Sequence, residues 1–254
     1  MNYLKKEIKN NFCIITLNRP EFKNAFNAEM IFEITETFKL LNQDLNIKAV
    51  ILKGEGTVFC AGADLNWMKS MVQFSYEENL ADSEKLWNMF ESVQCCIHPI
   101  IGIAQGAVFG GALGLLALCD YVYIHEKTKL CFSEVKLGLA PAVISKFILN
   151  KCSDNLVRPL MISGELFGSA QALNLGLVHQ IYSDNFDLDI IFNQFSSNGT
   201  DAMRATKKLL NSFLNKESDL IAKKLAIETI SQLRISSEAQ AKLQAKLQKF
   251  LIEK

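Results

Sequence analysis

The chain has 254 residues, of which 49% are hydrophobic and 21% are charged. This much apolar material supplies a folded core and excludes a disordered chain or a small disulfide scaffold. The 27 basic residues balance the 27 acidic ones, and a formal charge of zero argues against a protein that binds polyanions with its whole surface.

The first two thirds of the chain alternate between patterns typical of strands and of helices. Residues 4–9 and 12–17 are β-rich, and from Asn27 onward apolar residues recur every three or four positions, which predicts a helix with Asn27 as its N-cap. The further predicted elements are a strand at 49–52, a helix from 76 to about 93, a strand at 100–103, a helix from 111 to about 118 and a strand at 121–124. Strands joined by crossover helices predict an α/β fold with a largely parallel sheet.

Residues 92–119 carry no formal charge, so a membrane-spanning helix is one interpretation of this segment. Pro99, Gln105 and five glycines interrupt it, which instead predicts a strand, a loop and a helix in a buried core. The charged N-terminus shows no signal peptide, and we expect a cytoplasmic protein that binds no membrane. Seven cysteines without a C-x-x-C pair predict reduced, mostly buried thiols rather than a zinc site or disulfides.

The chain changes character near residue 198, and we predict a core over residues 1–198 and a helical region over residues 199–254. From Asp201 onward there is no Gly or Pro, and 11 basic residues outnumber 6 acidic ones. One side of the predicted last helix carries Leu243, Leu247, Phe250 and Leu251. We expect two or three helices here, with this apolar side buried against neighbouring subunits.

The first motif that could take part in binding or catalysis is the segment 59–65, which follows a predicted strand and a loop. Small residues at 61–63 let a ligand approach the backbone closely, and Asp64 suits the first turn of a following helix. A tight turn without a ligand explains the same residues equally well.

The second motif is the segment 105–114, in which Gly110 and Gly111 precede an apolar helix. Such glycines expose N–H groups at the start of the helix, where the helix dipole favours developing negative charge. The spacing is not that of a nucleotide-binding loop, and close helix packing explains the glycines about as well.

The third motif, 132–141, contains Glu134 in an apolar strand-and-turn context. If buried, this carboxyl would have a raised pKa and could act as an acid or a base, whereas a lone Glu is more often solvated at the surface. The chain has no G-x-S-x-G or H-E-x-x-H motif, and we expect structural roles for His98 and His179.

Taken in this order, the three motifs resemble the crotonase, or enoyl-CoA hydratase/isomerase, superfamily. Supporting matches are Leu17-Asn18-Arg19-Pro20, Asn24-Ala25-Phe26, Cys119-Asp120 and Ser163-Gly164-Glu165, within a similarity that covers about residues 8–182. The resemblance implies a spiral of β-β-α units with a helical C-terminal trimerisation region, assembled as a homotrimer or hexamer. It also implies an acyl-CoA thioester substrate and a stabilised enolate, without a metal or a separate cofactor.

Residue by residue, the resemblance assigns the two oxyanion-hole N–H donors to Ala63 and Gly111 and the acid–base group to Glu134. The positions that fall where the family holds coenzyme A and the acyl chain are Phe22, Lys23, Ala25, Ala61, Gly62, Asp64, Leu65, Trp67, Met68, Gly110 and Pro141. The best-known hydratases carry a second glutamate at the position of Gly114, which this chain lacks.

A single glutamate at this position is shared with Δ3-Δ2-enoyl-CoA isomerases and with hydratases of branched-chain acyl-CoA breakdown, such as leucine degradation. The stretches 61–68, 76–82 and 138–145 look most like methylglutaconyl-CoA and isohexenylglutaconyl-CoA hydratases, so we predict a hydratase. The alternatives are an isomerase that uses Glu134 and a non-catalytic CoA-binding or RNA-binding relative, although a basic tail is usually a solvated helix face. Lys69 and Lys136 are candidate partners for a distal carboxylate on the acyl chain.

Overall fold

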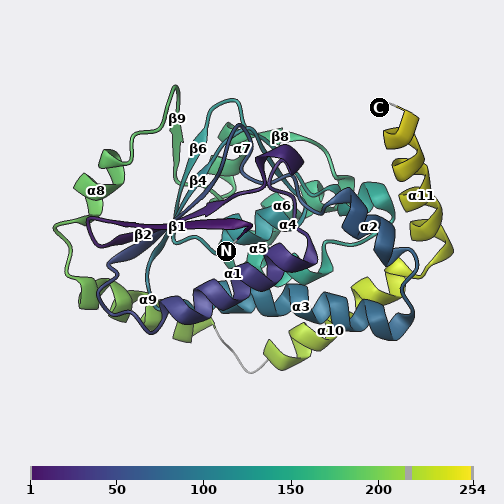
Figure 1. Cartoon of the computed structure of the whole chain (residues 1–254), viewed down its shortest axis with the longest axis horizontal. Helices are drawn as coiled ribbons and strands as arrows, with labels where there is room; N and C mark the ends of the chain where they lie inside the picture. Colours follow the sequence, from purple (N-terminus) through teal and green to yellow (C-terminus); the bar gives the residue numbers. More distant parts are fainter. Residues whose placement is uncertain (1, 215–218, 253–254) are drawn as a thin grey trace.

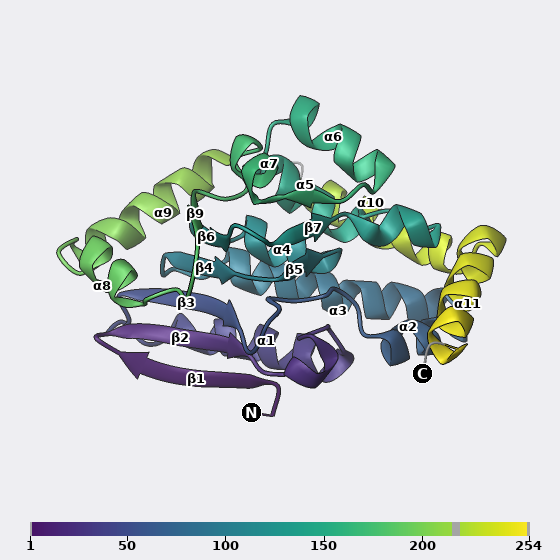
Figure 2. The same cartoon turned by 90° about the horizontal axis from the view of Figure 1, so that it is seen from above.

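Six strands form the larger of two sheets in the computed structural model, which describes residues 2–214 and 219–252. Their order across the sheet is β1-β2-β3-β4-β6-β9, as the two views in Figures 1 and 2 together show. They are β1 (Leu4–Lys9), β2 (Phe12–Leu17), β3 (Ala49–Gly54), β4 (Ile100–Ala104), β6 (Tyr121–His125) and β9 (Gln180–Tyr182). β1 and β2 form an antiparallel hairpin and every later pair is parallel, which confirms the predicted α/β fold.

A smaller sheet lies beside the larger one (Figure 2). It is formed in this order by β5 (Ala107–Phe109), β7 (Lys129–Cys131) and β8 (Phe167–Gly168). β7 is parallel to β5 and antiparallel to β8, so both sheets are mixed. An isolated bridge between Cys60 and Val108 joins β5 to the 59–65 motif, and this pairing brings the first two motifs together.

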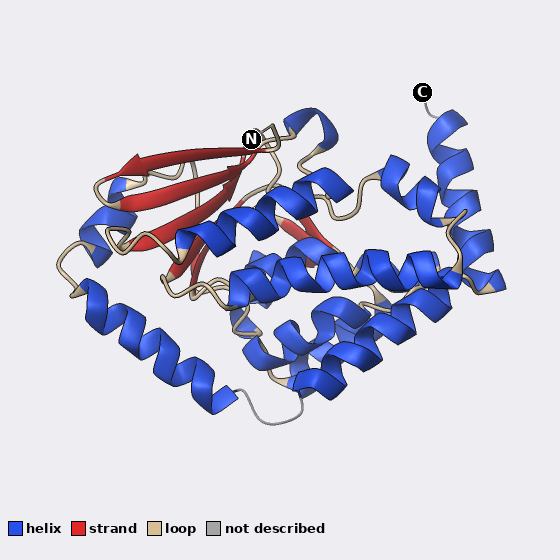
Figure 3. Cartoon of the chain, turned by 60° about the horizontal axis from the view of Figure 1, so that its bottom comes forward, coloured by secondary structure: helices blue, strands red, loops and turns tan. Residues whose placement is uncertain are grey.

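Helices pack around the sheets and make up most of the remaining described chain (Figure 3). The α-helices are α1 (Ala28–Leu41), α2 (Leu65–Met71), α3 (Tyr76–Gln94), α4 (Gly111–Ala117), α5 (Ala142–Lys151), α6 (Asp154–Ser163), α7 (Ser169–Asn174), α8 (Asp189–Phe195), α9 (Thr200–Leu214), α10 (Asp219–Arg234) and α11 (Ser237–Ile252). Two short 3₁₀ helices are η1 (Pro20–Phe22) and η2 (Ser133–Leu137).

Both faces of the larger sheet are buried. Cys13 and Ile15 of β2 face a core that includes α1 and α3, whereas Phe12 and Ile14 face a second core that includes Phe192 of α8. Successive side chains of a strand point to opposite faces, so an uninterrupted apolar run needs cover on both sides. This double cover explains why every residue of β2 is buried and why all except Thr16 are apolar.

Capping side chains mark where the longer helices begin. The Asn27 side chain accepts a hydrogen bond from the Met30 backbone N–H at 2.9 Å, which confirms the predicted N-cap of α1. Ser75 and Glu78 form a capping box at the start of α3. Because these capping residues lie next to the helices in sequence, the starts of both helices were predicted correctly.

The uncharged segment 92–119 contains the end of α3, the predicted strand β4 and the predicted helix α4, and the expected loop between them includes the short strand β5. Within the described ranges, no helix combines the length and the hydropathy needed to span a bilayer. His98 and His179 both form hydrogen bonds to backbone groups of neighbouring elements, which supports structural roles. All seven cysteines are free thiols, and all except Cys95 are buried.

The C-terminal helices pack onto the rest of the same chain. Lys207 of α9 donates a hydrogen bond to Asp120 at 2.7 Å, and α11 packs against α2 and η2. Leu243 of α11 is only 1% exposed in the single chain, so our expectation that it faces another subunit is wrong. Neighbouring helices of its own chain already remove it from water. The side chains of Phe250 and Leu251 lie outside the described residues.

Candidate active site

The 59–65 motif runs beside the segment that follows η1. The Phe26 N–H donates to the Gly62 carbonyl at 2.7 Å, and the Asp64 N–H donates to the Phe26 carbonyl at 2.8 Å. In such a parallel bridge the N–H of the residue between the two bonded groups, Ala63, points away from the bridge. Ala63 is exposed, and its N–H has no acceptor within the part of the chain that the structure describes. This N–H is therefore open to a ligand.

The paired glycines of the second motif lie against the first motif. Gly62 has a φ of +92°, and a Cβ at this position would come within 2.8 Å of the Phe109 carbonyl oxygen. Gly110, with a φ of +51°, precedes Gly111, the first residue of α4. The N–H groups of a first helical turn have no acceptor inside the helix. The Gly111 N–H also has no acceptor elsewhere among the described residues, so it is a second open donor. Ala63 and Gly111 thus belong to two backbone segments in direct contact.

Glu134 lies on η2 with its carboxyl group beside the paired glycines. A Cβ on Gly110 would lie 3.2 Å from Glu134 Oε1 and 3.4 Å from Ser133 Oγ. Oε2 is buried and has no hydrogen-bond partner among the described residues. Burial raises the pKa of Glu134 from 4.5 to about 7, partly opposed by a hydrogen bond with its own backbone. The alternative that Glu134 is a solvated surface residue is therefore wrong. Its carboxyl group can exchange a proton near neutral pH.

The raised pKa of Glu134 predicts a pH dependence of folding stability. Because the folded state favours the protonated acid, this contribution is fully present below pH 4.5 and is lost as the pH rises through about 7. The expected loss is about 3 kcal/mol, from about 1.4 kcal/mol per pKa unit. Urea unfolding of the wild type and Glu134→Gln at pH 4.5 to 8 measures it, because the difference between the two isolates Glu134. Two parallel stability profiles would contradict the prediction.

The position of the missing second glutamate is filled by apolar side chains. A Cβ on Gly114 would lie 2.6 Å from Ile144 Cγ2 and 2.8 Å from Phe90 Cε1. Both neighbours belong to the buried core, on α5 and α3. A carboxylate side chain at residue 114 therefore has no room unless this packing changes. Neither Ile144 nor Phe90 was expected at the site, since nothing in their local sequence indicates that they meet Gly114.

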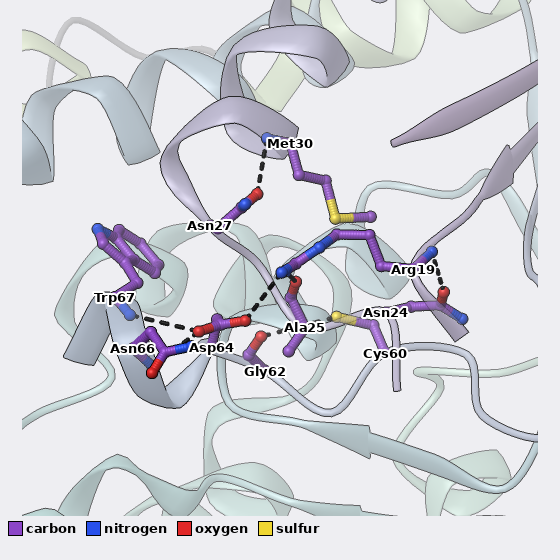
Figure 4. Close-up of polar contacts among 10 residues, drawn as sticks. All are labelled: Arg19, Asn24, Ala25, Asn27, Met30, Cys60, Gly62, Asp64, Asn66 and Trp67. Carbon is purple, nitrogen blue, oxygen red and sulfur yellow. Dashed lines mark hydrogen bonds and ion pairs between the residues drawn. The ribbon is translucent and has the colours of Figure 1, made fainter. Parts of the chain in front are cut away.

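A buried ion pair between Arg19 and Asp64 fixes the backbone where Ala63 leads into α2 (Figure 4). Asp64 is the N-cap of α2, and its Oδ1 accepts hydrogen bonds from the backbone N–H groups of Asn66 at 2.7 Å and Trp67 at 3.3 Å. Its Oδ2 accepts from Arg19 Nη2 at 2.9 Å, and the two side chains are only 7% and 5% exposed. Arg19 also donates to the Ala25 carbonyl. The carboxylate of Asp64 is therefore engaged by protein groups, and it sets the position of the preceding residue, Ala63.

The positions assigned to coenzyme A gather where the segments 22–26 and 61–65 meet. The Ala61 N–H donates to the Lys23 carbonyl at 3.0 Å, and Phe22, 47% exposed, lies under the Arg19 guanidinium with 4.6 Å between Cζ and the ring centre. Of the other assigned residues, Ala25, Gly62, Trp67, Met68 and Gly110 are buried, Leu65 and Pro141 are half-buried, and Lys23, Lys69 and Lys136 are exposed.

Trp67 makes a contact that the sequence did not reveal. Its indole N–H donates to the Asp82 carboxylate on α3 at 3.1 Å. The same carboxylate accepts a hydrogen bond from Arg234, the last residue of α10, at 2.8 Å. Asp82 lies in the 76–82 stretch that supports the resemblance, but only the fold shows which groups it joins.

Comparison with known proteins is consistent with this geometry. A family model described as "Enoyl-CoA hydratase/isomerase" matches residues 7–254, so the chain belongs to the enoyl-CoA hydratase/isomerase family and is an enzyme of that family. The crystal structure of an enoyl-CoA hydratase from Shewanella pealeana superposes with a TM-score of 0.79 at 34% identity, covering 97% of this chain and 94% of the other. The fold is therefore the α/β crotonase fold with C-terminal helices, as predicted.

Curated relatives include both a hydratase and an isomerase. An enoyl-CoA hydratase of Alternaria alternata is 28% identical over 177 residues, which cover 70% of this chain and 57% of the relative. The mitochondrial Delta(3,5)-Delta(2,4)-dienoyl-CoA isomerase of Mus musculus is 30% identical over 180 residues, which cover 67% of this chain and 55% of the relative. The chain thus spans a little over half the length of these two relatives.

Proposed function

We propose that the protein is a hydratase that adds water across the 2,3 double bond of an enoyl-CoA thioester. The observation that carries this proposal is the Glu134 carboxyl, whose buried Oε2 has no hydrogen-bond partner among the described residues, beside the backbone segments of two open N–H donors. Ala63 and Gly111 supply those donors to the thioester oxygen, where negative charge develops in the transition state. Family membership and this intact acid–base group argue against a non-catalytic CoA-binding or RNA-binding protein.

The proposed reaction uses one carboxyl in two roles. Ionised Glu134 takes a proton from water while the water oxygen bonds to C3 of the substrate. The electron pair of the double bond moves onto the thioester oxygen as an enolate, which the N–H groups of Ala63 and Gly111 stabilise. Glu134 then returns the proton to C2, and the product is a 3-hydroxyacyl thioester. A pKa near 7 suits a group that must accept and then donate a proton at neutral pH.

The proposed substrate is a branched or methylglutaconyl-type acyl-CoA. The supporting observations are the family resemblance of three stretches of sequence and the apolar packing of Phe90 and Ile144 around Gly114. The ester is held along the 22–26 and 61–65 segments, with Trp67 and Met68 on the acyl side. Lys69 and Lys136 are both exposed and remain candidates for a distal carboxylate. The resemblance also supports a homotrimer or hexamer, formed through surfaces other than Leu243.

A second candidate is an enoyl-CoA isomerase, and one observation favours it. With Phe90 and Ile144 at the position of the second glutamate, no carboxylate stands there to hold the attacking water. Glu134 alone could instead remove a proton from C2 of a 3-enoyl thioester and return it to C4, through a dienolate whose oxygen is held by the same two N–H groups. Such a proton transfer needs no bound water.

Product analysis in D₂O distinguishes the two reactions. We expect 2-enoyl-CoA or 3-methylglutaconyl-CoA to give a 3-hydroxyacyl product with one deuterium at C2 and syn stereochemistry, because one carboxyl serves one face of the double bond. A panel of straight, branched and glutaconyl thioesters, with products identified by NMR and mass spectrometry, measures both the reaction and the acyl preference. Migration of the double bond in 3-enoyl-CoA, with no hydration of any 2-enoyl ester, would establish the isomerase instead.

A further inference from the structure

A buried polar cluster joins α2 to the C-terminal helices, and we call its members Trp67, Asp82, Ser83 and Arg234 the Asp82 cluster. Trp67, Asp82 and Arg234 are 8%, 9% and 4% exposed, and Ser83 is fully buried. One oxygen of Asp82 accepts from the Trp67 indole at 3.1 Å and the other accepts from Arg234 at 2.8 Å. Arg234 also donates to Ser83 Oγ at 3.1 Å. A single carboxylate therefore bridges three helices.

This bridge holds the first turn of α2 by a second contact. Asp64 fixes the start of α2 through Arg19, and Trp67 is the third residue of the helix. The indole N–H is the donor that connects this turn of α2 to the neighbouring helix α3. With both contacts in place, α2 cannot rotate about its capped start without leaving a buried polar group unsatisfied.

The same cluster continues toward the element that carries Glu134. Arg234 ends α10, and Gln240 of α11 donates to the Arg234 carbonyl at 2.7 Å. Ala239 and Leu243 of α11 are buried where that helix packs on α2 and η2. Figures 1 and 2 both show α11 alongside α2. The Asp82 cluster thus fixes the junction between α10 and α11. From this junction α11 packs against α2, which follows Ala63, and against η2, which carries Glu134.

We propose that Asp82 is a positioning residue of the active site, which holds α2 through Trp67 and so keeps the Ala63 N–H aligned with Gly111 and Glu134. It touches neither the proposed substrate nor the reacting atoms. The inference rests on the proposed function, because alignment matters only if Ala63 donates to the thioester oxygen. A displacement of about 1 Å in such a constellation can cost about 100-fold in rate.

The chain offers a matched pair of variants, because it has two tryptophans and both are buried. Trp67→Phe removes the indole donor to Asp82 and keeps an aromatic ring in place. Trp87→Phe is the control on α3, since the Trp87 indole N–H has no hydrogen-bond partner among the described residues. We expect Trp67→Phe to lower kcat about 10- to 100-fold, whereas the smaller ring on the acyl side should raise KM by less than about threefold. Trp87→Phe should keep both parameters within about twofold of wild type.

The role of the Asp82 carboxylate is tested by a double-mutant cycle with Trp67 and by the fluorescence of the Trp67 indole. Asp82→Asn should lower kcat in the wild type but add little in the Trp67→Phe background, because the two residues act through one hydrogen bond. In the Trp87→Phe background, Trp67 is the sole tryptophan, and Asp82→Asn should shift its emission to longer wavelength as α2 loosens. If Asp82→Asn fails to fold, the comparison of Trp67→Phe with Trp87→Phe still decides the question.

Equal kcat values for Trp67→Phe and Trp87→Phe would overturn the positioning role, as would additive effects in the cycle. Failure of the proposed function has a different signature. The wild type would then act on no enoyl-CoA ester in the panel, while the Trp67 emission would still report whether Asp82 holds α2.

Discussion

Replacing Glu134 with Gln is expected to lower turnover by about 10²–10⁴-fold, the usual worth of a positioned acid–base group. Glutamine has nearly the same shape and fits the same buried space, but it cannot take a proton from water or return one to C2. Because Oε2 of Glu134 has no hydrogen-bond partner among the described residues, the amide should break no existing hydrogen bond there. Affinity for the CoA ester, measured by calorimetry, should therefore stay near the wild-type value.

The pH profile gives this prediction a second readout. In the wild type, kcat/KM should rise with pH through about 7, since the ionised carboxylate is the base. The residual activity of Glu134→Gln should lack this rise. Glu165→Gln, an exposed glutamate on the loop after α6, is the control and should behave as wild type. Turnover of Glu134→Gln within a factor of two of wild type would remove Glu134 from the mechanism.

Replacing Arg19 with Met is expected to lower the free energy of unfolding by about 3–5 kcal/mol, because it leaves the Asp64 carboxylate buried without its partner. The pair is 2.9 Å apart with both side chains nearly inaccessible, so water cannot solvate the remaining charge. The variant also loses the hydrogen bond from Arg19 to Ala25 and the stacking on Phe22. Urea unfolding followed by circular dichroism measures the loss.

An exposed pair of the same type serves as the control. Arg158 and Asp154 form an ion pair at 2.6 Å on α6, with side chains 62% and 51% exposed. Arg158→Met should cost no more than about 1 kcal/mol, because solvent screens such pairs. If Arg19→Met lowers the free energy of unfolding no more than Arg158→Met does, burial does not increase the contribution of the Arg19–Asp64 pair to stability. Any activity that survives in Arg19→Met should show a lower kcat, since the N-cap that precedes α2 would no longer be fixed.

Local patterns in the sequence located most of the secondary structure. The strands at 4–9 and 12–17 have the predicted bounds, and the Asn27 cap begins α1 as expected. These features depend on residues within one turn or one strand, where alternation, caps and breakers act directly. The smaller strands β5, β7 and β8 were not predicted, because two or three residues are too few to show a periodicity.

The sequence by itself determined which segments could form a functional site, while the tertiary structure decided which of their residues come into contact. The glycines at 62, 110 and 111 are present in the sequence, but the contacts of Gly62 with Phe109 and of Gly110 with Glu134 depend on pairings between segments more than 20 residues apart. The pKa of Glu134 likewise follows from desolvation by the whole fold, since nothing adjacent to it in sequence distinguishes a buried glutamate from a solvated one. For the same reason Leu243, which local periodicity placed on an apolar face, was assigned to a subunit contact although its own chain covers it. Periodicity shows that a face must be buried, and only the three-dimensional arrangement selects the surface that buries it.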